Sequence, residues 1–478
     1  MFPSRKFLTK IALGPAVLLI LAGCETQGSL MKSRIRKVEK GLLRAVYIKG
    51  TAPEKLSLKD RMAFYKVPGV SVAIIDRYQL DWAKAYGTKD LRTYAPVVPE
   101  TLFQAGNLIR PLLAAAFLSL DEKQKLPLDS EASLVLKSWK LPPEKRSGVS
   151  AKPVTLRELL MRGAAFSGPA SPGLPRKNNV PALLAVLNGL SPGPLGAKDG
   201  LPVLQQALTD QIGVPLPAIM DASVFLPLAM TRSVCEVPLP PVVEASAASG
   251  HLRGGQMVEG GWLNYPVAAA DGLWTTPTDY AAFLNGVVGD AMGRSATVLS
   301  ASSARTLLSP PVSGGSFGYV FEGTGNDAFF HIQARTSGYT AYACYYPARG
   351  RGAVIMTNSD NGGLLSDEIL RAVSAAYGWA HFASAEKTLF RLDPSIYDQY
   401  VGRYEVTPEY YLKVSAEDYY LEIEPTGQAR TKFYVESETI FFSVDPFIRI
   451  QFRRDDRGKV NGLVLWQEDF EQKAVKVR

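Results

Sequence analysis

The chain has 478 residues, which is enough for one large domain and a smaller one. Hydrophobic residues make up 46% of it, a share that supports a sizeable core and excludes general disorder. The formal net charge of +8 is concentrated between residues 31 and 66, where Lys and Arg outnumber Asp and Glu by 11 to 3, so the near-neutral remainder excludes nucleic acid as a partner.

The first 24 residues are typical of an export signal. A basic start is followed by an apolar run, IALGPAVLLILAG, that is too short for a stable transmembrane helix. The run ends in LAGC, which resembles a bacterial lipobox and implies cleavage before Cys24 and lipidation (palmitate included) of that cysteine. By resemblance to Gram-negative lipoproteins, Glu25 after the cysteine implies the outer membrane, with the protein facing the periplasm. The alternative is an ordinary secretory signal with a chance cysteine.

A linker and a basic helix are expected over residues 25–54. The stretch MKSRIRKVEKGLLRAVYIKG predicts a helix that lies against anionic head groups or presents a solvated face on the globular domain, and both interpretations stay open. Residues 57–66 predict a second helix with Ser57 as its N-cap. The alternating residues that follow predict a hairpin with its turn at 76–79.

The stretch FQAGNLIRPLLAAA, residues 103–116, predicts a turn into a helix. Because proline fits a helix only in its first turn, Pro111 places the helix start near Arg110. Further along, Thr155 and Glu158 form a capping box, LPVLQQALTDQIG predicts an amphipathic helix, and another helix starts at Thr278. Strands at both ends of this region, with helices between, predict that the two ends meet in one sheet.

The sequence pattern changes near residues 385–395 from mixed helix and strand signals to strand signals alone. Beyond that boundary, eight short alternating segments follow one another in fewer than ninety residues, separated by turn signals such as Asp455-Asp456-Arg457-Gly458. This pattern predicts a small antiparallel barrel or sandwich over residues 390–478.

Cysteine and histidine are scarce. Cys235 and Cys344 favour small buried apolar positions, with one disulfide between them as the alternative. The three histidines have no paired Cys/His spacing, so neither a zinc site nor any other cofactor is expected.

Five sequence blocks follow one another along the chain: VPGVSVAIID, LLMRGA, FLPLAMTRS, YPVAAADGLWTTPTDYAAFL and GAVIMTNSDNG. Together they resemble the serine β-lactamase/penicillin-binding-protein-like family, in its class C and esterase-like branch. The resemblance implies an α/β (α+β) domain over residues 55–385, with an antiparallel sheet flanked by helices. The C-terminal segment resembles the small lipocalin-like β-domain appended to such hydrolases.

The family's first motif, S-x-x-K at a helix start, supplies a serine nucleophile and a lysine one turn on. Here those positions hold Asn107 and Arg110. A carboxamide is no useful nucleophile, and a guanidinium stays protonated at neutral pH, so both chemical roles are lost. Asn107 is expected to cap the helix, with ligand contact as the alternative. For Arg110, a bound anion and a plain salt bridge stay open, and Asp271 is a possible partner of Arg110 or Lys198.

The other two motifs are degenerate as well. Aligning the Y-x-N motif places its tyrosine near Gly196 and its asparagine near Lys198. The H-x-G or K-T-G motif aligns with His331 to Gln333, so His331 survives but Gln333 replaces the glycine. The usual H-T-x-G loop is Met161-Arg162-Gly163-Ala164, and the literal S-x-x-K at Ser384–Lys387 is a chance match at the domain boundary.

Three functions follow as hypotheses. The first is a catalytically inactive envelope lipoprotein that binds a ligand, such as a cell-wall fragment, or a protein, in the old cleft around Asn107, Arg110 and His331. The second is a hydrolase with a displaced serine, the best being Ser337, served by His331 or Lys198 as base; the other candidates are Ser167 and Ser171. The third is a structural module in which the barrel or the basic segment 31–66 does the binding.

Overall fold

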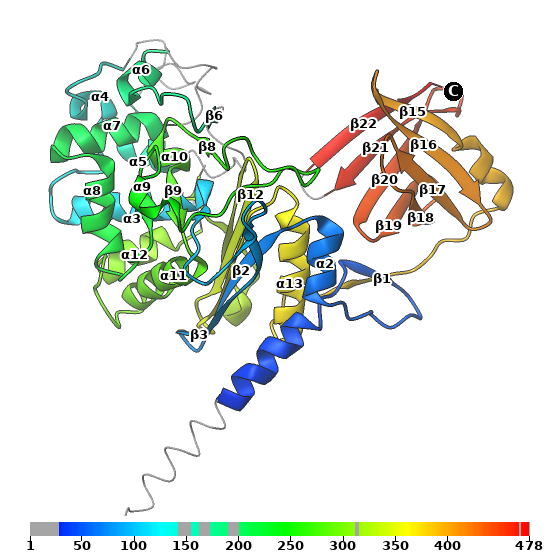
Figure 1. Ribbon diagram of the computed structural model, residues 1–478, viewed down its shortest axis with the longest axis horizontal. Helices are drawn as coiled ribbons and strands as arrows, with labels where there is room; N and C mark the ends of the chain where they lie inside the picture. The colour runs from blue at the N-terminus through cyan, green and yellow to red at the C-terminus, as the bar shows by residue number, and fades with distance from the viewer. Residues whose placement is uncertain are drawn as a thin grey trace, which may run out of the picture.

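The computed structural model describes residues 28–141, 154–161, 173–189, 200–310, 315–467 and 470–477. It contains a domain of helices around an antiparallel sheet and a separate closed β-barrel at the C-terminus (Figure 1). The expected fold class, a mixed α/β domain followed by a small all-β barrel, is confirmed.

The large domain is built on a seven-stranded sheet with the order β10-β11-β12-β13-β2-β3-β4. Its strands are β2 (Gly69–Asp76), β3 (Gln79–Asp90), β4 (Ala95–Pro96), β10 (Val320–Glu322), β11 (Phe329–Thr336), β12 (Tyr339–Tyr346) and β13 (Arg351–Thr357). In the central pair, Val354 of β13 lies opposite Ala73 of β2. The prediction that the two ends of the domain share one sheet is therefore confirmed, as is the hairpin with its turn at Arg77 and Tyr78.

Helices cover both faces of this sheet. The helices α2 (Leu58–Tyr65) and α13 (Gly362–Tyr377) lie on the side towards the barrel, and α3 (Ile109–Glu122) and α11 (Pro277–Ala291) lie on the other (Figure 1). Strand β2 is buried on both faces: Val72 belongs to the hydrophobic cluster under α2 and α13, whereas Ala73 belongs to the cluster under α3. A strand that is buried on both faces has apolar residues at nearly every position instead of alternating ones, as in the sequence GVSVAIID.

The remaining helices and short strands stand mainly beyond α3. They are α4 (Ala132–Val135), α5 (Leu156–Met161), α6 (Leu183–Leu187), α7 (Leu201–Ile212), α8 (Leu216–Met220), α9 (Pro241–Glu244), α10 (Ala268–Asp271), α12 (Ala301–Leu307), β5 (Phe103–Gln104), β6 (Leu174–Pro175), β7 (Val234–Cys235), β8 (Leu263–Asn264) and β9 (Leu273–Thr275). The expected helix caps are mostly present. Ser57 accepts a hydrogen bond from the Asp60 amide, and Thr155 and Glu158 form the capping box. Helix α11 starts at Pro277, one residue earlier than predicted.

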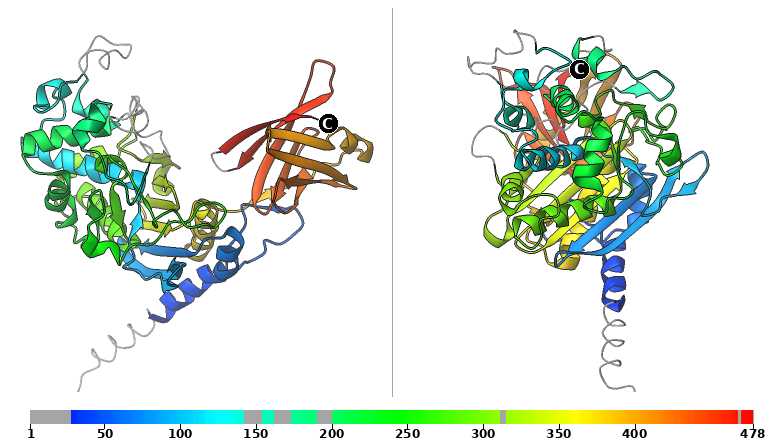
Figure 2. Two further views of the ribbon diagram at one scale, coloured as in Figure 1. Left: turned by 45° about the horizontal axis from the view of Figure 1, so that its top comes forward. Right: turned by 90° about the vertical axis from the view of Figure 1, so that its left-hand side faces the viewer.

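The basic N-terminal segment differs from its prediction in length. A helix spans residues 28–39 and extends away from the domain (Figure 2), but it does not continue to residue 50. Gly41 follows its last turn at a position where no side chain fits, because a Cβ there would lie 2.3 Å from the carbonyl oxygen of Lys37. The chain then forms β1 (Val46–Ile48). Val38 is buried against the domain, whereas Lys32 and Arg36 are exposed.

The eight predicted C-terminal strands close into a barrel in chain order. They are β15 (Gly402–Thr407), β16 (Tyr410–Glu417), β17 (Tyr420–Pro425), β18 (Thr431–Val435), β19 (Ile440–Val444), β20 (Phe447–Arg454), β21 (Val460–Gln467) and β22 (Phe470–Lys476). Before the barrel, β14 (Ala385–Lys387) pairs in parallel with β1. Closure leaves no unpaired sheet edge, which suits a small domain.

The chance S-x-x-K match has a structural role in this connection. The hydroxyl of Ser384 donates to the carbonyl of Arg44 at 2.7 Å, and Lys387 Nζ lies 2.5 Å from Glu436 Oε1 on the barrel. Neither residue lies at a helix start, which agrees with the interpretation of this match as chance.

Cys235 and Cys344 are both buried and unbonded, as the favoured alternative predicts. Within the described ranges, no helix is long and apolar enough to cross a membrane.

Candidate functional site at the start of α3

The turn into α3 is built by a short strand, a glycine and a proline. Strand β5 pairs with β9 and ends at Gln104, and Gly106 then adopts a φ of +42°. A single 3-10 turn over Gly106–Leu108 leads into α3, with Pro111 in the first turn of the helix. The predicted helix start near Arg110 is confirmed.

Asn107 and Arg110, which the sequence is expected to place at the S-x-x-K positions, lie together at this turn. Asn107 is 4% exposed and Arg110 is 6% exposed. Arg110 Nε donates to Asn107 Oδ1 at 3.3 Å, across one helical turn. Leu108, not Asn107, occupies the N-cap position of α3, so the prediction of Asn107 as the cap is wrong. Asn107 lies inside the 3-10 turn, where its carboxamide oxygen accepts the hydrogen bond from Arg110.

Strand β11 and helix α10 pack against the turn. A Cβ built on Gly106 would lie 3.0 Å from Thr336 Cγ2 and 3.7 Å from Asp271 Oδ1. Asp271 is 1% exposed, so the site holds a buried carboxylate beside the Asn107 turn. Glycine at position 106 thus allows the turn to approach both neighbours closely.

Tyr265 adds a buried hydroxyl to the same region. Its oxygen accepts a hydrogen bond from the Ser337 amide at 3.0 Å. Burial raises the pKa of the Tyr265 phenol and outweighs the hydrogen bonds with Ser337, which lower that pKa; the Asp271 and Asp360 carboxylates also act to raise it. The phenol is therefore neutral at physiological pH and is no ready-made base.

The start of α3 is also held from the other side. A Cβ built on Gly318 would lie 3.0 Å from Arg110 Cβ and 3.1 Å from Pro111 Cδ, so this segment rests directly on the first turn. Tyr280 donates its hydroxyl to the carbonyl of Leu108 at 3.2 Å. These contacts fix the positions of Asn107 and Arg110.

The structure does not bring His331 to this site. Its ring stacks on Phe329 and Tyr342, with ring centroids 5.7 and 5.6 Å away, and both residues belong to the hydrophobic cluster under α2 and α13. Gln333 follows two residues later and shares that face of β11, since side chains alternate along a strand. The expected pocket around Asn107, Arg110 and His331 is thus divided by the sheet.

The residues that β11 does present to Asn107 were missed by motif matching. Ile332 and Ala334 lie in the hydrophobic cluster on the α3 side, and Thr336 continues that alternation. Counting in twos from the buried Phe330 would have identified this set and assigned His331 to the opposite face.

Ser337 begins the turn between β11 and β12 and is the one candidate displaced nucleophile that the described residues include. Its proposed base His331 lies on the other face of the sheet, as described above. Gly196, Lys198, Ser167, Ser171 and residues 162–164 of the expected loop lie outside the described residues, as does Cys24. Among the described residues, no group of three or more His, Cys, Asp or Glu side chains is placed to hold a metal ion.

The chain is similar in sequence and in fold to several penicillin-binding proteins and related structures. The penicillin-binding protein 4* of Bacillus subtilis (strain 168) is 22% identical over 442 residues, covering 82% of this chain and 92% of that protein. The octameric penicillin-binding protein homologue from Pyrococcus abyssi aligns with a TM-score of 0.57 and 18% identity, covering 87% of this chain and 98% of the other. SurE aligns with a TM-score of 0.54 and 19% identity, covering 88% and 97%, and SurE with D-Leu gives a TM-score of 0.52 at 18% identity with the same coverage.

At these identities the solved structures share the fold. The family profile named Beta-lactamase matches residues 57–376, which is about two thirds of the sequence and includes the turn at Asn107 and Arg110. The chain therefore belongs to the Beta-lactamase family.

Proposed function

We propose that this protein is a catalytically inactive member of the family that acts in the cell envelope by binding a ligand or a protein. The observation that carries the proposal is the pair Asn107 and Arg110 at the start of α3, with Arg110 Nε 3.3 Å from Asn107 Oδ1. An amide nitrogen cannot take the part of a serine hydroxyl, and a guanidinium cannot accept the proton.

The same contact makes the Asn107 side chain part of a fixed polar arrangement rather than an attacking group, because its carboxamide oxygen accepts from Arg110. The displaced-serine alternative needs a base beside Ser337; the His331 ring packs on Tyr342, a residue of the cluster under α2 and α13, and the other candidate base, Lys198, lies outside the described residues. The labelling experiment described below would detect a reactive serine if the protein has one.

The envelope location rests on the sequence. The LAGC stretch resembles a lipobox, and lipidation of Cys24 would attach the protein to a membrane, with Glu25 favouring the outer membrane. Residue 28 begins the helix whose exposed face carries Lys32 and Arg36, basic residues that suit anionic head groups. Globomycin treatment of expressing cells tests this step: a lipoprotein accumulates as its uncleaved precursor, and an ordinary secreted protein does not.

Inactivity is tested on the chain from residue 25 onward, treated with a fluorophosphonate and with a fluorescent penicillin, followed by intact mass measurement. The penicillin probe follows from the names of the relatives. We expect no adduct and a cooperative melting transition. A stoichiometric adduct would refute the proposal, and peptide mapping would then identify the nucleophile.

Binding is tested with the same preparation. D-Leucine, present in one SurE structure, and peptidoglycan-derived peptides are the first ligands to screen by thermal shift. An Arg110→Gln variant is the matched control, because it keeps a polar side chain but removes the buried positive charge. If the barrel alone carries the function, a protein without residues 390–478 should lose its function in cells. The same protein should still show every ligand-induced rise in melting temperature that comes from the α3 site.

A further inference from the structure

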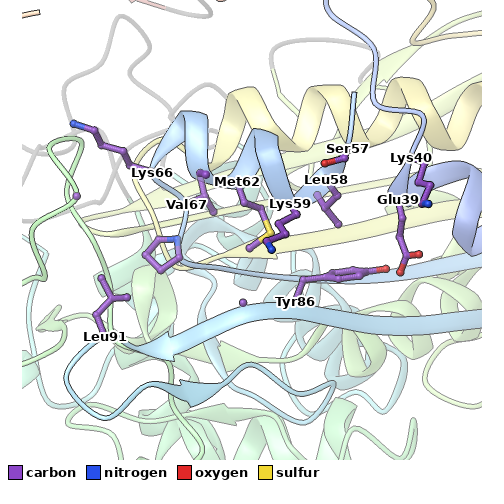
Figure 3. A pocket seen from close by; sticks show the side chains of 14 residues that line it. Glu39, Lys40, Ser57, Leu58, Lys59, Met62, Lys66, Val67, Tyr86 and Leu91 are labelled. Carbon is purple, nitrogen blue, oxygen red and sulfur yellow. The ribbon is translucent and has the colours of Figure 1, made fainter. Parts of the chain in front are cut away.

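A cavity of about 900 Å³ lies between α2 and β3 (Figure 3). Its size falls within the range of about 300–1,000 Å³ that is typical of small-molecule sites. It is distinct from the α3 site, because Met62 and Tyr86 on its walls pack with the hydrophobic cluster under α2 and α13. An inference about it therefore stands apart from the proposed function.

The walls of this cavity are predominantly apolar. Leu58 and Met62 stand one helical turn apart on α2, and Figure 3 shows Met62 directed towards β3, where its Cε would lie 2.7 Å from a Cβ built on Gly87. Val67 also lines the cavity, and Leu91, which is 38% exposed, lies towards one end (Figure 3). A space walled in this way suits a hydrocarbon chain, which needs no hydrogen-bond partners, better than a sugar or a nucleotide.

Positive charge surrounds the apolar walls. Lys40, Lys59 and Lys66 all line the cavity and are exposed. Over the described residues, the structure records no ion pair for any of these three lysines. Within that part of the chain, an anion would not have to displace an acidic side chain from any of them.

The acidic residue of the described lining is Glu39, and its charge is already compensated. Lys84 Nζ lies 2.5 Å from Glu39 Oε1, and the Tyr86 phenol stands beside the same carboxylate. Burial, followed by the Glu39 charge, raises the pKa of Tyr86, so the phenol stays neutral. The three lysines thus leave the cavity mouth with a net positive charge.

We propose that this cavity binds a long-chain fatty acid. The hydrocarbon chain lies between Leu58 and Met62 on one side and Tyr86 on the other, and the carboxylate pairs with Lys59, which Figure 3 shows reaching from α2 over the cavity. Apolar burial provides the affinity and the lysine charge selects an anionic head.

The test is isothermal titration calorimetry of the chain from residue 25 onward with laurate, myristate and dodecanol, each below its micelle or solubility limit. The dissociation constant should fall roughly fourfold for each added methylene, so myristate binds more tightly than laurate. Dodecanol, which has the chain of laurate without its charge, should bind at least tenfold more weakly than laurate.

Two variants locate the site. Ala63→Trp fills the cavity from the exposed surface of α2 and should abolish binding of both laurate and dodecanol, whereas Ser302→Trp on the surface of α12 should change neither. Lys59→Glu should weaken laurate at least fivefold and leave dodecanol unchanged, with Lys125→Glu as the control remote from the cavity. Melting temperatures establish that each variant is folded.

Three results would overturn the proposal: no laurate binding by the folded protein, unchanged binding in Ala63→Trp, or equal affinities for laurate and dodecanol. None of them bears on the α3 site, which is read separately by covalent labelling. Conversely, an adduct at the α3 site would leave the fatty-acid proposal intact.

Discussion

Arg61 of α2 and Asp445 of the barrel form an ion pair in which Arg61 Nη2 lies 2.5 Å from Asp445 Oδ1. The same guanidinium donates from Nε to Glu368 of α13 at 2.8 Å. Arg61 and Glu368 are 5% and 3% exposed, so one buried cation joins two helices of the large domain to the turn between β19 and β20. The orientation of the barrel is thus specified by a charge rather than by an apolar seam alone.

Replacing Arg61 with leucine should strongly destabilise the large domain. The variant Arg61→Leu leaves the Glu368 carboxylate buried without its cation, which costs about 3–5 kcal/mol for a broken buried pair. Denaturant unfolding monitored by tryptophan fluorescence measures the loss. The matched control is Arg157→Leu at the more exposed pair with Asp129, where a change of at most about 1 kcal/mol is expected. An equal loss of unfolding free energy in the two variants would contradict the interpretation of Arg61 and Glu368 as a stabilising buried ion pair.

Asp445→Asn should loosen the barrel without unfolding it. Asp445 also accepts from Arg44 Nε at 2.8 Å, so neutralising it weakens two contacts between the domains. We expect a larger radius of gyration in small-angle scattering and faster proteolysis between residues 388 and 393. Glu438→Gln is the control, because Glu438 pairs with Arg454 within the barrel. An unchanged scattering profile would show that other contacts fix the orientation.

Glu436 should make this arrangement sensitive to acid. Burial acts to raise its pKa, but hydrogen bonds from Lys387 and Arg449 outweigh it and hold the pKa below the ordinary value of 4.5. A carboxyl group whose pKa is lowered by folding stabilises the fold above its unfolded pKa, and that stabilisation is lost as the pH falls through the folded pKa. Unfolding curves from pH 7 to pH 3 should therefore lose stability below about pH 4.5, and Glu436→Gln should flatten part of that slope.

Local rules explain why so much of the fold follows from the sequence. Ser57 and Pro111 mark helix starts by side-chain chemistry that acts within one turn, and the eight alternating C-terminal segments have a period that suits only strands. The predicted basic helix is too long because the charges of Lys37 and Lys40 resemble a solvated helix face, whereas the chain packs so closely at Gly41 that no side chain fits there.

The candidate site was harder to predict because it depends on contacts between distant segments. Asn107 and Arg110 were found by their spacing, but the face on which His331 lies is set by the register of β11, where one residue of shift moves a side chain through the sheet. The apolar cavity beside α2 has no motif at all: Met62 and Tyr86 come from different elements and meet only in the folded domain.

The two cysteines should behave as inert buried thiols. Burial raises the pKa of both, to about 12 for Cys344, so little thiolate forms near neutral pH. Iodoacetamide at pH 8 should add nothing to the folded protein expressed without residues 1–24, and two carbamidomethyl groups after denaturation without a reductant. Failure to modify the denatured protein until a reductant is added would instead reveal a disulfide between Cys235 and Cys344.

On the proposed alignment with S-x-x-K, placing serine at position 107 and lysine at position 110 should create a reactive nucleophile, but only when both residues are changed. In Asn107→Ser alone, the new hydroxyl faces a guanidinium that cannot take its proton. In the double variant Asn107→Ser/Arg110→Lys, an amine one helical turn away can do so. A positioned base contributes about a hundredfold or more, so the double variant should react with a fluorophosphonate at least that much faster than the single variant. Intact mass against time measures both rates, with Arg110→Lys alone as the control that lacks a nucleophile. Equal labelling of the single and double variants would show that the arginine is not what prevents the reaction, and labelling of Arg110→Lys alone would reveal a serine elsewhere.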